Sequence, residues 1–142
     1  MYILDTDLIS LLESVSTSPE AQRLRFRLAS LKPEDHITTI ITFEEQVRGW
    51  TAYLAQKRTM AQQVGAYRRL KNVLNRYLKL TVLEFDEAAA EEFERLQKLR
   101  IRIGTMDLKI AAITLSRNAT LLTRNTKDFS RVPNLHIEDW SV

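Results

Sequence analysis

Short apolar segments of strand length alternate along the chain with longer segments whose apolar residues repeat at helical spacing. The strand-like segments are residues 2–4, 36–41, 81–85, 120–123 and 135–138. This alternation is typical of a parallel sheet with helices packed against both of its faces. We therefore predict an α/β fold with a doubly wound, mainly parallel sheet of four or five strands, formed by residues 1–142 as a single domain.

The helices between these strands have recognisable first residues. We predict helices over 7–12, from Pro19 to about 31, from Thr42, around 70–77, from the Asp86 cap to about 102, and from a cap at Thr105. Thr42 and Glu45 have the spacing of a capping box, with Thr42 as the N-cap. Residues 125–128 are predicted to form a loop.

The composition excludes several classes of protein. The chain has no Cys, and its three Gly are far apart. Disulfides, thiolate metal sites, phosphate-binding loops and dinucleotide-binding motifs are therefore excluded. No apolar run is long enough for a membrane span, and Asp5 interrupts the N-terminal apolar residues too early for a signal peptide. We expect a cytoplasmic protein without membrane contact.

Basic and acidic residues are segregated in the middle of the chain. Residues 46–83 contain eight Lys or Arg and no Asp or Glu, whereas residues 84–94 contain six acids. A basic face of this kind favours binding to a polyanion or to an acidic partner protein. The alternative is an ordinary solvated helical surface.

Polar side chains follow several predicted strands. Asp5 directly follows the first strand, Glu45 lies in the first turn of the helix after the second, and Asp107 lies in the first turn of a later helix. Asn125 and Asp128 follow the fourth strand. Because ligands of parallel sheets bind where the strand order reverses, at the carboxyl ends of the strands, we expect these side chains to converge. Clustered carboxylates repel one another unless a cation lies between them, and oxygen ligands suit Mg²⁺ or Mn²⁺.

Each acid also has a structural alternative. Glu45 could be only the capping partner of its helix, and Asp107 could complement a helix dipole from the second helical position. Asp5 could be the N-cap of the first helix, a role that Asp7 could take instead, and Asp128 could be an ordinary loop acid. An acid that ends an apolar strand, such as Asp5, is at risk of burial and needs a partner. The whole set of side chains is more informative about a shared site than any one of them.

Four ordered segments then match the motifs of one family. They are Leu4–Ser10, Ile41–Gln46 followed by Gly49, Met106–Ala112, and Leu122–Phe129. These segments resemble the motifs of PIN-domain ribonucleases, specifically the VapC-type toxins of toxin–antitoxin pairs, and the resemblance spans essentially the whole chain. The sequence departs from the family pattern at Asn125, where many members have Asp, and at Asp7, where Asn is common.

The resemblance implies a PIN fold and an endoribonuclease that depends on Mg²⁺ or Mn²⁺, is held inactive by a cognate antitoxin and usually forms a homodimer. By position, Asp5, Glu45 and Asp107 are the core catalytic acids, and Asp5 and Asp107 are the metal ligands. The fourth catalytic acid is assigned to Asp128, although Asn125 could occupy that place by binding a metal-bound water. A bound metal would lower the pKa of a water and stabilise charge on the phosphate.

Further side chains are candidates for orienting or binding the RNA. The hydroxyls of Thr6, Ser10 and Thr105 and the amide of Asn125 could orient water or a phosphate, although Thr105 could simply cap its helix. The candidates for contact with the RNA backbone are Arg68, Arg69 and Arg76. The aromatic residues Trp50, Tyr53, Tyr67 and Tyr77 could stack on bases, but their helical spacing favours packing in the core or in a dimer. The helices within 42–79 are candidates for dimer and antitoxin contacts.

Two other functions are compatible with parts of the pattern. A PIN-fold module that binds nucleic acid or regulates without cleaving it is the main alternative, because Asn125 cannot supply charge. A phosphoacceptor domain would need an Asp at the end of a later strand, and Asp86 is better explained as a cap. His36 and His136 lie in strand patterns away from the acids, so we do not expect either to be a general base.

Overall fold

A computed structural model describes residues 1–142. Its elements, in chain order, are β1 (Tyr2–Leu4), α1 (Thr6–Glu13), α2 (Pro19–Leu28), a 3₁₀ turn (Pro33–Asp35), β2 (Ile37–Thr39), α3 (Ile40–Ala55), α4 (Met60–Tyr77), β3 (Thr81–Leu83), α5 (Glu87–Lys98), α6 (Thr105–Ser116), β4 (Thr120–Leu122), α7 (Thr126–Phe129) and β5 (His136–Glu138). None of these helices has both the length and the apolar content that a bilayer span requires.

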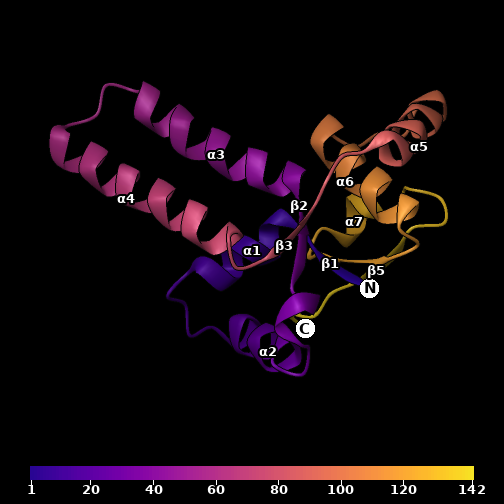
Figure 1. The fold of residues 1–142 in the computed structure, drawn as a ribbon, viewed down its shortest axis with the longest axis horizontal. Coiled ribbons are helices and arrows are strands. Elements are labelled where there is room, and N and C mark those ends of the chain that lie inside the picture. Colours follow the sequence, from indigo (N-terminus) through magenta and orange to yellow (C-terminus); the bar gives the residue numbers. More distant parts are fainter.

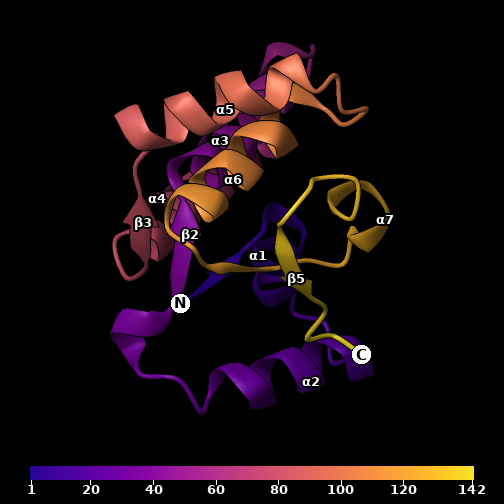
Figure 2. The same cartoon turned by 90° about the vertical axis from the view of Figure 1, so that its right-hand side faces the viewer.

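The five strands form one sheet in the order β3-β2-β1-β4-β5, and every neighbouring pair is parallel. From β1 the chain moves outward to β2 and β3, then returns to the other side of β1 to form β4 and β5. The strand order therefore reverses between β1 and β4. Helices lie on both faces of the sheet, with α2 on one side and α5 and α6 on the other (Figures 1 and 2). The predicted α/β class and doubly wound parallel sheet are confirmed.

The two central strands contribute alternate side chains to two separate cores. Ile3 and Leu121 pack into one core with residues of α5 and α6, whereas Leu4 and Leu122 pack into the other with residues of α1 and α2. All four side chains are almost fully buried. Because successive residues of a strand point to opposite faces, a sheet covered on both sides needs such uninterrupted apolar strands. The carboxyl ends of β1 and β4 are thus held between two packed layers.

Helices α3 and α4 form an antiparallel hairpin that extends away from the sheet (Figure 1). Its base is buried, and there the Tyr77 hydroxyl donates a hydrogen bond of 2.7 Å to Gln46 Oε1. The Phe43 and Tyr77 rings pack edge to face at 5.0 Å. Towards the tip most side chains are exposed, and a capping box between Thr59 and Gln62 begins α4. This cap was not among our predictions.

Several predicted boundaries were wrong. The strand predicted over 36–41 ends at Thr39, which is the N-cap of α3 because its hydroxyl accepts a 3.1 Å hydrogen bond from the Thr42 amide. Thr42 is therefore inside the helix, and Glu45 lies in the second turn, which excludes the predicted capping box. The β-branched run through Ile41 suggested a longer strand, but the Thr39 cap begins the helix earlier.

Other ends also differ from the predictions. The N-cap of α6 is Gly104, so Thr105 is the first helical residue and Asp107 the third, not the second. α2 and α5 end before the predicted 31 and 102, and the chain after α5 takes a positive φ of 51° at Arg100. The predicted 125–128 loop contains the short helix α7.

Candidate active site

Asp5 lies at the carboxyl end of β1, at the point where the strand order reverses. It is the N-cap of α1 and only 4% exposed. Its Oδ1 accepts a 2.8 Å hydrogen bond from the Thr6 amide, and its Oδ2 accepts one of 2.8 Å from the Thr123 hydroxyl at the end of β4. Two neighbouring strands therefore fix the orientation of this carboxylate. The structure confirms that Asp5 caps α1, the alternative role that we considered. Asp5 is in addition buried at the point where the strand order reverses.

Burial has a large electrostatic effect on Asp5. Loss of solvent, followed by the charge of Asp7, raises the pKa of the Asp5 carboxyl from 3.8 to about 7. The hydrogen bonds from Thr123 and Thr6 lower this pKa, and the charge of Asp107 raises it. No Lys or Arg forms an ion pair with Asp5. The charged form of this carboxylate is therefore unfavourable unless a cation approaches it.

Asp107 reaches the same edge of the sheet from the first turn of α6. Burial, followed by the charges of Glu45, Asp128 and Asp7, raises the pKa of Asp107 to about 6. Asp107 also belongs to no ion pair in the structure. The charges of these acids therefore act on one another and on Asp5, as expected for side chains near the carboxyl ends of parallel strands. We call this group the acidic edge: Asp5, Asp7, Glu45, Asp107 and Asp128.

Glu45 is positioned by hydroxyl groups. The Thr6 hydroxyl donates a 2.8 Å hydrogen bond to Glu45 Oε1 and lies 3.2 Å from the Thr42 hydroxyl. The Thr42 hydroxyl lies in turn 3.3 Å from the Thr39 hydroxyl. Thr6 thus orients an acid directly in this structure, while its amide holds Asp5. These contacts of Thr39 and Thr42 could not be predicted, because the start of α3 was misplaced.

Asn125 and Asp128 lie at the two ends of one turn of α7. The Asn125 side-chain amide donates a 3.2 Å hydrogen bond to Asp128 Oδ2, and Arg131 lies 3.6 Å from Asp128 Oδ1. The Asn125 backbone amide donates to the Thr123 hydroxyl at 3.0 Å, which links this turn to Asp5. The Arg131 guanidinium therefore partly neutralises the charge of Asp128, whereas Asp5 and Asp107 have no such partner.

Asp7 was assigned no functional role in our predictions. It is not the N-cap of α1, because Asp5 has that place. Its Oδ2 accepts a 3.0 Å hydrogen bond from the Arg124 amide and forms a 3.8 Å ion pair with Arg124 Nε, whereas its Oδ1 is buried without a hydrogen-bond partner. Burial raises the pKa of Asp7 as well. The sequence contained one indication that Asp7 lies at this edge, because it is a second acid two positions after Asp5.

The acidic edge fits a hard divalent cation. No group of three or more His, Asp or Glu side chains is arranged so that all of them could ligate one metal ion. Mg²⁺ is usually held by one or two carboxylates and several waters, so an open set around Asp5 and Asp107 is an appropriate donor set. The unpartnered Oδ1 of Asp7 and the absence of an ion pair at Asp107 support this fit.

An open groove of about 530 Å³ begins at Glu45, the one acid of the acidic edge that lines it, and runs between α1, α3 and α4. Its lining residues are Thr6, Ser10, Glu13, Ser14, Glu45, Gln46, Gly49, Trp50, Tyr53 and Arg69. Ser10 is exposed at the wall of this groove, as its proposed role requires. Thr105 is also exposed but does not line the groove.

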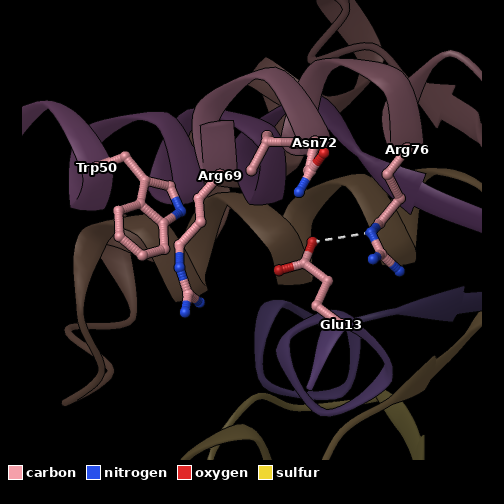
Figure 3. Close-up of a pocket in the computed structure, with 6 residues that line it drawn as sticks. Glu13, Trp50, Arg69, Asn72 and Arg76 are labelled. Carbon is pink, nitrogen blue, oxygen red and sulfur yellow. Dashed lines mark ion pairs between the residues drawn. The ribbon is translucent and has the colours of Figure 1, made fainter. Parts of the chain in front are cut away.

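The three predicted RNA-binding arginines have different surroundings. Arg69 lines the groove and also a smaller adjoining cavity of about 90 Å³ (Figure 3). Arg76 lines only the smaller cavity, where its Nε forms a 3.2 Å ion pair with Glu13 Oε1. Arg68 is exposed on α4 and lines neither cavity. Tyr77 packs in the base of the hairpin, as its helical spacing suggested.

His36 and His136 lie away from the acidic edge. His36 precedes β2, and its Nε2 lies 3.1 Å from the Leu28 carbonyl oxygen. His136 is the first residue of the outer strand β5 and is exposed. Neither imidazole forms part of the groove lining.

Comparison with known proteins extends these observations. Residues 2–135 match the PIN domain family. "Ribonuclease VapC1" of Haemophilus influenzae (strain R2866) is 31% identical over 146 aligned positions, which cover 99% of this chain and 98% of that protein. The "tRNA(fMet)-specific endonuclease VapC" of Salmonella typhimurium is 29% identical over 143 positions, which cover 98% and 97%.

Solved structures show the same fold. VapBC-1 from nontypeable Haemophilus influenzae matches with a TM-score of 0.73 and 26% identity, covering 99% of this chain and 98% of that one. DNA-bound VapBC from Salmonella typhimurium matches with a TM-score of 0.75 and 26% identity, covering 98% and 97%. Together with the acidic edge at the switch point, these likenesses show that the chain belongs to the PIN domain family, among its VapC-type members.

Proposed function

We propose that this chain is an endoribonuclease toxin that hydrolyses RNA phosphodiester bonds with Mg²⁺ or Mn²⁺ held at the acidic edge. The observation with most weight is the pair of carboxylates of Asp5 and Asp107, half-buried or buried at the switch point of a VapC-type PIN fold without a cationic partner. The names of the relatives, a ribonuclease and a tRNA-specific endonuclease, support RNA as the substrate.

In this proposal Asp5 and Asp107 hold the metal, and Glu45 and Asp128 complete the catalytic acids. When bound, a divalent ion would acidify a water and stabilise charge on the phosphate. Glu45, which accepts a 2.8 Å hydrogen bond from the Thr6 hydroxyl, would accept a proton. Ser10 and Asn125 are proposed to orient water or phosphate oxygens. Thr105, the first residue of α6, is proposed to do the same two positions before Asp107.

We further propose that a cognate antitoxin protein inhibits the chain. Two of the similar structures are VapBC complexes, and one was solved with bound DNA. An Arg side chain of a partner would satisfy the uncompensated carboxylates of the acidic edge and block access to them. The homodimer, implied by the family resemblance, is part of the same proposal.

Cleavage of total tRNA and rRNA by the purified chain, freed of any antitoxin, tests the proposed function. We expect cutting with Mg²⁺ or Mn²⁺, no cutting with EDTA, and no cutting by Asp107→Asn in any of these conditions. Failure of the folded wild-type chain to cut these RNAs with either metal would contradict the proposal. That result would instead support a PIN-fold module that binds nucleic acid without cleaving it, which Asn125 favours because its amide supplies no charge.

A further inference from the structure

The groove continues well beyond the acidic edge, and aromatic side chains line its far end. Trp50 lines both the groove and the smaller cavity beside it (Figure 3). Tyr53, one turn further along α3, packs edge to face against Trp50 with the ring centroids 5.9 Å apart. Both rings are only partly buried. They therefore present aromatic surface to the same open space that Glu45 and Thr6 face from its other end.

Gly49 keeps this part of the groove open. It lies in the interior of α3, where Gly lowers helix stability relative to Ala by a factor of about two to five in the folding equilibrium. A Cβ at Gly49 would meet no atom within 4 Å, so packing does not require a glycine here. The groove gives an alternative reason for a glycine at position 49, because any larger side chain would enter the space beside Trp50.

Arg69 provides a positive charge at the same place. Its guanidinium lies 5.4 Å from the centroid of the Trp50 ring, and the side chain is exposed. Arg69 belongs to no ion pair, because Glu13, the acid in the adjoining cavity, is paired with Arg76. The charge of Arg69 is thus free to bind an anion from the groove.

We propose that Gly49, Trp50 and Arg69 form a subsite for one unpaired nucleotide next to the cleavage site. The base stacks on the Trp50 ring in the space that Gly49 leaves, and Arg69 contacts its phosphate. This inference rests on the proposed ribonuclease function. Trp50 lies about 7.5 Å along the helix axis from Glu45, so a nucleotide bound there adjoins the one at the acids.

The free energies of the two contacts favour a base over the Arg69 guanidinium on the face of the Trp50 ring. An exposed cation–π contact such as that of Arg69 with Trp50 changes an equilibrium constant by a factor of about two to five. Stacking of a base on an aromatic side chain contributes a factor of about five to a hundred. A base therefore displaces the guanidinium from the ring, and the released Arg69 binds phosphate. An acidic protein segment fits less well, because the face of an aromatic ring is electronegative and gains nothing from a carboxylate.

Binding of RNA in EDTA, which prevents cutting, tests the subsite separately from catalysis. The probes are a short single-stranded RNA and the same strand annealed to its complement, measured by anisotropy and by quenching of tryptophan fluorescence. The other tryptophan, Trp140, is only 8% exposed, so quenching reports mainly on Trp50. We expect the single strand to quench strongly and the duplex, whose base faces are covered, to quench weakly.

Variants define the expected result. Trp50→Leu and Gly49→Leu should each weaken single-strand binding about tenfold and change duplex binding by less than about twofold. Trp50→Phe should retain most of the affinity. Phe26→Leu is the matched control, because Phe26 is an 82% exposed aromatic residue on α2 outside the groove.

The outcomes separate the two proposals. If the wild-type chain binds single-stranded RNA and both leucine variants bind it equally well, the subsite is wrong while the ribonuclease proposal stands. If the wild-type chain neither binds nor cuts RNA, the ribonuclease proposal fails, and the subsite fails with it. Gly49→Leu replaces a glycine with a better helix former in open space, so loss of binding by this variant is not explained by unfolding.

Discussion

In the acidic edge, the buried carboxylate of Asp5 is held at the end of β1 by hydrogen bonds, whereas the basic side chains of the α3–α4 hairpin are mostly exposed. Asp5 receives hydrogen bonds from Thr6 and Thr123, residues that are 117 positions apart in sequence. Arg69 forms no ion pair and lies 5.4 Å from the centroid of the Trp50 ring. The first region holds Asp5 in a fixed orientation and leaves Asp5 and Asp107 without an ion pair, although Asp7 and Asp128 are paired with Arg124 and Arg131. The second region has exposed charge, such as that of Arg69, that is available to bind an anion. This difference matches the needs of catalysis in one region and of binding a flexible polymer in the other.

The two regions also contribute differently to stability. Gathering acids at the sheet edge raises the pKa values of Asp5 and Asp107, so their ionisation opposes folding in the absence of a cation. The hairpin has no comparable concentration of unpaired charge in a buried position. We therefore expect substitutions at the acidic edge to reduce activity without reducing stability, and substitutions in the hairpin to alter binding or packing.

The largest expected effect is a difference in the rate of RNA cleavage between variants of two adjacent glutamates of α3. Glu45→Gln should lower RNA cleavage by about a hundredfold or more, because an acid of the catalytic set is lost. Glu44→Gln is the matched control, since Glu44 forms a 2.7 Å ion pair with Arg48 and does not line the groove. The measurement is the initial rate of RNA cleavage by each variant with Mn²⁺. Equal losses in the two variants would remove Glu45 from the active site.

A second prediction concerns the dependence of stability on pH. The pKa of Asp5 rises from 3.8 to about 7 on folding, so the folded state binds the extra proton. The stability that this proton provides is fully present below about pH 4 and is lost as the pH rises through about 7. Denaturant unfolding in EDTA should show this decline, and Asp107→Asn should make it shallower. A stability that rises from pH 4 to 7 in the wild-type chain and the variant alike would contradict this account.

A smaller effect is expected where α1 meets the hairpin. Glu13 pairs with Arg76 at 3.2 Å and accepts a 3.1 Å hydrogen bond from Gln46. Glu13→Gln can keep the hydrogen bond but not the ion pair, so it should lower the free energy of unfolding by about 0.5–1 kcal/mol. Glu20→Gln, in a 3.9 Å pair between exposed side chains, should have a smaller effect in the same chemical denaturation. The reverse order would contradict the assigned role of Glu13.

The smallest predicted effect is on salt dependence. Arg69→Ala should weaken RNA binding in EDTA by several-fold and lower the slope of log affinity against log salt concentration by about one. Arg68→Ala, on the same helix but outside both cavities, should change the slope less. Identical slopes for Arg69→Ala and the wild-type chain would remove Arg69 from the RNA surface.

Much of the fold could be predicted because its signals are local. Apolar strands and helical periodicity identified the order of the elements. Asp5 and Asp107 were expected at one edge because ligand sites of parallel sheets lie at the carboxyl ends of the strands. The start of α3 could not be predicted in this way. A β-branched run is typical of a strand, and only the Thr39 cap shows that the helix begins at Ile40.

The parts of the site that were missed depend on contacts between distant residues. The hydrogen bond from Thr123 to Asp5 joins residues 118 positions apart, and no local pattern indicates it. The position of Trp50 beside Arg69 depends on how α3 packs against α4. Helical spacing alone suggested that Trp50 packs in the core or in a dimer. The structure shows it packed against the core and also lining the wall of the groove.

The most direct test of the acidic edge is calorimetric titration of the purified, EDTA-stripped chain with Mn²⁺ at pH 8, where Asp5 and Asp107 are ionised. We predict saturable binding to the wild-type chain, at least tenfold weaker binding to Asp107→Asn, and unchanged binding to Glu44→Gln. Binding that Asp107→Asn leaves unchanged, or the absence of binding to the folded wild-type chain, would contradict the assignment of the acidic edge as a metal-dependent nuclease site.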